Sequence, residues 1–152
     1  RGTVANAVTI SYKADTKNIT GKVSVPVRLT VSNLAKVDVT VNGEFTVPMI
    51  LDSGCSTTLI SIAEARYLYE KGCFSQEDFL GVAQSQIADG SIVENMVINL
   101  RQLVIGNKIV SYNVKATVSN AQAPLLLGNE VLDRAPSYSV DNVNKQVVFK
   151  LN

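Results

Sequence analysis

Apolar and polar residues alternate along much of this 152-residue chain. Between Lys22 and Val31 every second residue is apolar, which is the period of a strand with one buried face. Pro26 falls on the polar phase, which favours a position at the edge of a sheet. The same alternation returns at Val37–Val41, Met96–Leu100, Val114–Val118 and Val147–Leu151. The chain is therefore predicted to be mostly β.

Turn signals join these strands closely. Asn42-Gly43 is a strong signal for a short hairpin, and it separates Val37–Val41 from a returning apolar segment, Phe45–Leu51. Gly106-Asn107 marks another turn. Many short strands at short spacing indicate a closed or strongly bent sheet rather than a layered α/β fold.

Short helices are predicted between the strands. Ser61 and Glu64 have the spacing of a capping box, and Gly72 is placed to end the helix that follows. A second start lies at Ser75–Phe79, and a third begins near Asn129 and is stopped by Pro136. We therefore expect one to three short helices.

Composition excludes several classes of function. A chain of this length allows one domain, and 14 basic against 13 acidic residues give a net charge of +1 without a basic block, so no nucleic acid is expected as a partner. The chain has no histidine, which excludes Ser-His-Asp and Cys-His hydrolysis and His-ligated zinc. Two cysteines alone cannot form a four-ligand zinc site. No metal or cofactor is expected.

The segment from Val47 to Thr58 is the most informative in the chain. It places Asp52 directly after an apolar run and before a loop of small residues. A carboxylate at the end of a buried strand is costly unless it is hydrogen-bonded or functional. Taken alone, Asp52 is also compatible with a turn that its own side chain caps.

Three motifs in order resemble the retropepsin-like aspartic proteases. They are Asp52-Ser53-Gly54 after apolar residues, a turn Ala88-Asp89-Gly90-Ser91 in a strand pair, and Leu125-Leu126-Leu127-Gly128-Asn129 before a short helix. The resemblance implies a closed or strongly bent antiparallel, barrel-like acid protease fold over residues 36–152. Residues 1–35 then form an N-terminal extension with at least one strand and no assigned role. That extension is open to three interpretations: a spacer from a membrane anchor, a pro-segment or an added strand.

The resemblance also implies roles for residues. Asp52 would be the catalytic carboxylate of an aspartic endopeptidase, and since the chain has one Asp-Ser/Thr-Gly triplet, the second carboxylate of the dyad must come from another copy in a homodimer. Ser53, Gly54 and Gly128 would support the catalytic loop. A peptide or protein substrate would be contacted by Ser56 and by a flap whose tip is Ala88, Asp89 and Gly90.

Other interpretations remain open at this stage. A catalytically silent peptide-binding or dimerisation module would keep the fold without hydrolysis. A Ser53 or Cys55 nucleophile would need a base other than histidine. Cys55 is compatible with redox control of the loop and, more simply, with a small buried residue. Val147–Leu151 fits either a dimer strand or a strand in its own sheet. The compartment is not encoded, so a soluble domain of a periplasmic or membrane-tethered protein is one expectation.

Overall fold

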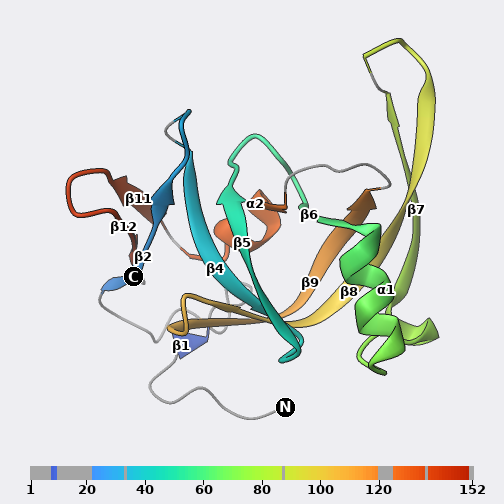
Figure 1. Ribbon diagram of the computed structural model, residues 1–152, viewed down its shortest axis with the longest axis horizontal. Helices are drawn as coiled ribbons and strands as arrows, with labels where there is room; N and C mark the ends of the chain where they lie inside the picture. Colours follow the sequence, from blue (N-terminus) through green and yellow to red (C-terminus); the bar gives the residue numbers. More distant parts are fainter. Residues whose placement is uncertain are drawn as a thin grey trace.

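The structure, a computed structural model, describes residues 8–9, 22–32, 34–86, 88–119, 125–135 and 137–150 (Figure 1). Strands dominate these residues, as the alternating pattern predicted. The elements in chain order are β1 (Val8–Thr9), β2 (Lys22–Pro26), β3 (Arg28–Leu29), β4 (Ala35–Val41), β5 (Phe45–Leu51), β6 (Thr58–Ser61), α1 (Ile62–Glu70), the 3-10 turn η1 (Gln76–Asp78), β7 (Phe79–Gln86), β8 (Ile92–Ile105), β9 (Ile109–Ser119), β10 (Leu126–Leu127), α2 (Asn129–Leu132), β11 (Ser137–Asp141) and β12 (Gln146–Lys150).

The hairpin of β4 and β5 follows the predicted pattern. Val37, Val39 and Val41 are buried on one face of β4, because alternate side chains of a strand point the same way. Asn42 and Gly43 have φ values of 50° and 71°, as a type I′ turn requires. The chain then returns as β5 over the full length of the predicted strand, ending at Leu51.

The large sheet is strongly bent. Its pairings run from β9 through β6, β10, β5, β4 and β8 and return to β9, so these strands form a closed circuit around the core. The β1–β9, β6–β9 and β5–β10 pairings are parallel and the rest of the sheet is antiparallel. Alternation along one strand does not reveal the direction of its partner, so these parallel pairs could not be predicted from the sequence.

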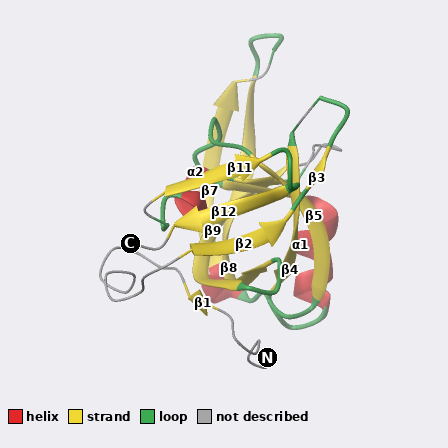
Figure 2. Cartoon of the chain, turned by 90° about the vertical axis from the view of Figure 1, so that its left-hand side faces the viewer, coloured by secondary structure: helices red, strands yellow, loops and turns green. Residues whose placement is uncertain are grey.

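A three-stranded sheet of β11, β12 and β2 lies beside the large one (Figure 2). Strand β12 is central and pairs with β11 on one edge and β2 on the other. The sequence allowed two interpretations of Val147–Leu151, and the structure shows the second, a strand within its own sheet. Leu151 lies outside the described residues. Pro26 ends β2 at an edge of the sheet, as its position on the polar phase predicted.

The segment predicted as one strand from Lys22 to Val31 divides between the two sheets. Strand β2 ends at Pro26, and β3 pairs with the start of β4 in the large sheet. Between them, the Val27 amide donates to the carbonyl of Lys145 at 3.0 Å. Val25 and Val27 are buried in the core, so part of the predicted N-terminal extension packs with the remainder of the chain.

The helices begin and end near the predicted residues. Ser61 caps α1 and Glu64 completes the capping box, while Gly72 has a φ of +75° beyond its C-terminus. The predicted second helix is the short turn η1, and the third is α2. Pro136, the predicted stop of the third helix, lies outside the described residues. Within the described residues, no helix is long and apolar enough to cross a membrane.

Candidate active site

The loop that carries Asp52 joins two strands of the bent sheet. Strand β5 ends at Leu51 and β6 begins at Thr58, and β10 lies between them. Beside β10, the Ile50 amide donates to the carbonyl of Leu125 at 2.9 Å, and the Asp52 amide donates to that of Leu127 at 3.1 Å. The backbone of Asp52 is thus fixed by the apolar run that precedes Gly128.

Backbone amides of the loop bind both the side chain and the carbonyl of Asp52. The Gly54 amide donates to Asp52 Oδ1 at 2.9 Å, and the Cys55 amide donates to the Asp52 carbonyl at 3.2 Å. The carboxylate is half-buried, whereas Ser53 and Gly54 are exposed. Among the described residues, nothing donates a hydrogen bond to Oδ2 of Asp52. One carboxylate oxygen therefore caps the turn, as the sequence alone also allowed, and the other accepts no hydrogen bond within the described residues.

The start of α2 supports the loop from behind. The amides of Asn129 and Glu130 donate to the carbonyls of Cys55 and Ser56 at 2.8 and 3.0 Å. The Asn129 side-chain amide also donates to the carbonyl of Ser53, at 2.6 Å. These bonds satisfy amides at a helix N-terminus that have no partner within the helix. They connect the first and third motifs of the sequence directly.

Gly128 is buried between the two motifs. A Cβ atom added at Gly128 would overlap the Thr57 carbonyl group and lie 2.8 Å from the carbonyl oxygen of Cys55. Both neighbours are backbone atoms, so neither can rotate away. Glycine at this position therefore lets α2 approach the Asp52 loop closely enough to form the bonds described above.

Hydrogen bonds of the Thr57 and Cys55 side chains stabilise the end of the loop before β6. The hydroxyl groups of Thr57 and Thr117 lie 3.0 Å apart and share a hydrogen bond between the loop and β9. The Cys55 thiol donates to the Thr57 carbonyl at 2.9 Å. Cys55 and Cys73 are both free thiols, each half-buried. Redox control through Cys55 stays a hypothesis.

A groove of about 460 Å³ opens beside this loop. Strand β7, from Leu80 to Gln84, and Val97 of β8 form one side. Ser56 and Thr57 of the loop, with Lys115 and Thr117 of β9, form the other. Of the residues assigned to substrate binding from the sequence, Ser56 lines this groove, whereas Ala88, Asp89 and Gly90 do not. Asp52 is not part of the lining either.

Ala88, Asp89 and Gly90 lie at the exposed tip of the β7–β8 hairpin, which projects from the body of the protein (Figure 1). Asp89 Oδ1 accepts hydrogen bonds from the hydroxyl and the amide of Ser91, at 2.6 and 2.8 Å. These bonds hold the pKa of Asp89 below its usual value. Gly90 has a φ of +89°, which favours glycine at the tip.

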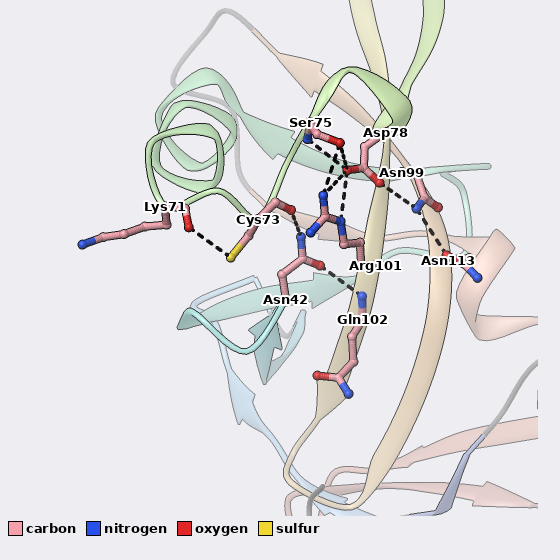
Figure 3. A network of polar contacts seen from close by, with 9 residues as sticks. All are labelled: Asn42, Lys71, Cys73, Ser75, Asp78, Asn99, Arg101, Gln102 and Asn113. Carbon is pink, nitrogen blue, oxygen red and sulfur yellow. Dashed lines mark hydrogen bonds and ion pairs between the residues drawn. The ribbon is translucent and has the colours of Figure 1, made fainter. Parts of the chain in front are cut away.

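A polar network anchors the base of the same hairpin (Figure 3). Arg101 of β8 donates to Asp78 Oδ2 through Nη2 at 2.8 Å and through Nε at 3.0 Å, and Asn99 donates to Oδ1 at 3.2 Å. Burial raises the pKa of Asp78, but the hydrogen bonds from Arg101, Ser75 and Asn99 and the charge of Arg101 outweigh it and leave the pKa below its usual value.

Sequence reasoning missed the contributions of Thr57, Thr117, Asn129 and Lys115. Asn129 and Thr57 stood in recognised motifs, but their partners lie far away in the chain. Thr117 and Lys115 fall on the polar phase of β9, which marks them as outward-facing without showing what they face. Within the described residues, no group of three or more acidic or cysteine side chains could hold a metal ion.

Comparison with known proteins places this arrangement in a class. A family model described as aspartyl protease matches residues 37–131, so the chain belongs to the aspartyl protease family. The match includes the Asp52 loop, the projecting hairpin and most of α2.

A solved structure identifies the fold more narrowly as retropepsin-like. The protein is similar to a retropepsin-like aspartic protease from Rickettsia conorii, with a TM-score of 0.63 and 19% sequence identity over 86% of this chain and 90% of that one. At this identity the likeness shows the fold, and it confirms the family resemblance seen in the sequence. No curated protein sequence matches the chain.

Proposed function

We propose that this protein is an aspartic endopeptidase that works as a homodimer, in which the Asp52 carboxyl groups of two copies form the catalytic dyad. The observation that carries the proposal is the environment of Asp52, whose Oδ1 is bound by the Gly54 amide while Oδ2 accepts no bond within the described residues. The chain has one Asp-Ser-Gly triplet, so a dyad of this kind needs a second copy.

The chemistry follows from two carboxyl groups in contact. Two negative charges at that distance repel, so the pair holds one proton and titrates as a unit. The ionised carboxylate takes a proton from a water molecule as that water attacks the peptide carbonyl. The protonated partner donates its proton to the carbonyl oxygen, which gives a tetrahedral diol. As the diol collapses, the carboxyl group that took the proton from water donates it to the peptide nitrogen and the C–N bond breaks. A hydroxyl proton of the diol returns to the other carboxylate, so the pair again holds one proton. Ser53 and Gly54 are the small residues next to Asp52 in the loop, and Gly128 lets α2 pack against that loop.

The groove beside the loop is suited to an extended peptide. Leu80 and Val82 on its β7 side are 50% and 57% exposed, so a bound apolar side chain would remove both from water. Ser56 lies on the opposite side, four residues after Asp52 in the sequence. In this proposal the β7–β8 hairpin is a flap, and its tip at Ala88, Asp89 and Gly90 moves toward the substrate when the flap closes.

The test compares cleavage of an unfolded protein by the wild type and by Asp52→Asn, over acidic to neutral pH. Asn keeps the shape of the side chain and removes the proton that the dyad shares. We expect activity in the wild type and a loss of at least about a hundredfold in Asp52→Asn, because general acid–base catalysis contributes on that order. Asp133→Asn, an exposed position at the end of α2, is the control and should keep wild-type activity.

Two outcomes would contradict the proposal. Full activity in Asp52→Asn would place the chemistry elsewhere in the chain. Binding of peptides without cleavage by the wild type would instead identify the silent binding module.

A further inference from the structure

The groove beside the Asp52 loop has two chemically different sides. Its β7 side carries Leu80 and Val82, which are apolar and exposed. Its opposite side carries three hydroxyl groups, from Ser56, Thr57 and Thr117, together with the ammonium group of Lys115. Among the described residues that line the groove, Lys115 is the one with a charge. The electrostatic character of the groove is therefore positive on its polar side.

Lys115 is held on this side by the register of β9. Thr117 and Lys115 are two residues apart and so lie on the same face of the strand, while Val114 and Ala116 are buried on the other. Thr117 bonds Thr57 of the catalytic loop, which fixes the strand beside the loop. The backbone amide of Lys115 donates to Glu130 Oε1 at 2.9 Å and is thereby tied to α2.

The carboxylates of Asp78 and Glu130 are engaged with other cations. Asp78 forms an ion pair with Arg101 at 2.8 Å, and Glu130 forms one with Arg134 at 3.4 Å. In the part of the chain that the structure describes, the ammonium group of Lys115 forms no ion pair. Lys115 is exposed, so its charge is available to a ligand in the groove.

We propose that Lys115 determines specificity by selecting substrates with an acidic side chain at the position that lies against Ser56, Thr57 and Thr117. This inference rests on the proposed function and narrows its substrate class to extended peptides with Asp or Glu near the cleaved bond. Thr57 and Thr117 use one of their two hydroxyl protons on each other, so Ser56 and the other of these two threonines can donate hydrogen bonds to the carboxylate, and Lys115 supplies the opposite charge. The apolar β7 side of the groove contacts the CH₂ groups of the substrate's Asp or Glu side chain and the substrate residue next to it.

The test is a cleavage profile of a mixed peptide library, read by mass spectrometry, for the wild type, Lys115→Glu and Lys150→Glu. Lys150 is exposed in the small sheet, so Lys150→Glu changes the net charge equally without changing the groove. We expect the wild type to enrich Asp and Glu at one position by up to about fivefold, the upper end of the range for an exposed ion pair. Lys115→Glu should lose that enrichment and favour Lys or Arg at the same position. Lys150→Glu should keep the wild-type profile.

The reversal of preference separates specificity from a structural role, because a damaged fold lowers all cleavage without favouring basic residues. A profile that is the same in the wild type and Lys115→Glu overturns the inference and leaves the proposed function intact. If the wild type cleaves no peptide, the proposed function fails. Lys115 is then tested by capture of the same library on Asp52→Asn with and without Lys115→Glu. Acidic peptides captured equally by both overturn the inference as well.

Discussion

At the scale of single residues, the Asp52 loop depends on two glycines in different ways. An alanine Cβ at Gly128 would overlap backbone atoms of Thr57, whereas one at Gly54 would meet only Asp52 Oδ1, at 3.2 Å. The first substitution forces the loop and α2 apart. The second disturbs the carboxylate and leaves the packing around it in place. An alanine at Gly128 should therefore lower stability, whereas an alanine at Gly54 should lower activity with little loss of stability.

We predict that Gly128→Ala lowers the free energy of unfolding by about 1–3 kcal/mol, the usual cost of overpacking a buried site. Its activity should fall as well, because the loop carries Asp52. Gly54→Ala should change stability by less than about 1 kcal/mol and still reduce activity. Urea unfolding followed by circular dichroism, with cleavage assays on the same samples, measures both quantities. Equal stability of the wild type and Gly128→Ala would contradict the packing described here.

The sequence identified the Asp52 loop as the candidate site, but it did not show why position 128 is a glycine. Asp52-Ser53-Gly54 is a local pattern, and the apolar run before it showed where a strand ends. The close approach at Gly128 involves Cys55 and Thr57, more than seventy residues away, and no local pattern encodes that contact. The position of Lys115 in the groove could not be predicted for the same reason.

At the scale of elements, the base of the hairpin depends on the pairing of η1 with β8. Asp78 in η1 is buried, and its carboxylate is bound by Arg101 and Asn99 of β8. Removing a charge from such a pair leaves hydrogen bonds unmade in a place that water reaches poorly. In the ion pair of Arg28 with Asp38 both side chains are exposed, so this pair is the control for the effect of burial on stability.

We predict that Asp78→Asn lowers the free energy of unfolding by about 1–3 kcal/mol at pH 7. Asp38→Asn should change it by no more than about 1 kcal/mol, as is usual for exposed pairs. The pKa of Asp78 is lower in the folded protein than its usual value, so its contribution is complete above that usual value and is lost as the pH falls through the folded pKa. The difference between the wild type and Asp78→Asn should therefore shrink below about pH 4.

Urea unfolding at a series of pH values measures this difference. A gap between the wild type and Asp78→Asn that stays constant down to pH 3 would show that the ionised pair with Arg101 does not stabilise the hairpin base.

Local elements were predictable to the extent that their signals are local. Alternation and Asn42-Gly43 predicted β4, its turn and β5, and the capping box predicted the start of α1. The division of the first predicted strand at Val27 was not predictable, because alternation continues through it while the partner changes from β12 to β4. Parallel pairs such as β5 with β10 join segments far apart in the chain, so only the folded structure reveals them.

At the scale of the whole molecule, we propose that residues 22–29 fold as one unit with the protease domain rather than as a separate extension. Strand β2 covers one edge of β12 along its length, and Val25 is fully buried. Val25 also packs so closely on the β8–β9 turn that a Cβ at Gly106 would overlap it.

We predict that Val25→Ala lowers the free energy of unfolding by about 2 kcal/mol, because it leaves a cavity in the core. Lys22→Ala, at the exposed start of the same strand, should be close to neutral. Urea unfolding of both variants tests the proposal. A neutral Val25→Ala would indicate that this segment is an appendage to the domain.

In the proposed mechanism two copies of Asp52 form one active site, and a mixing experiment can show whether they do. Wild-type protein at a fixed, low concentration is combined with increasing amounts of Asp52→Asn, and cleavage of an unfolded substrate is measured after the mixture equilibrates. We predict that activity falls as Asp52→Asn is added. The dyad of a mixed dimer has only one Asp52 carboxyl group, so it has no second carboxyl group with which to share a proton. Wild-type activity that stays unchanged at a large excess of Asp52→Asn would show that each copy works alone and would contradict the shared dyad.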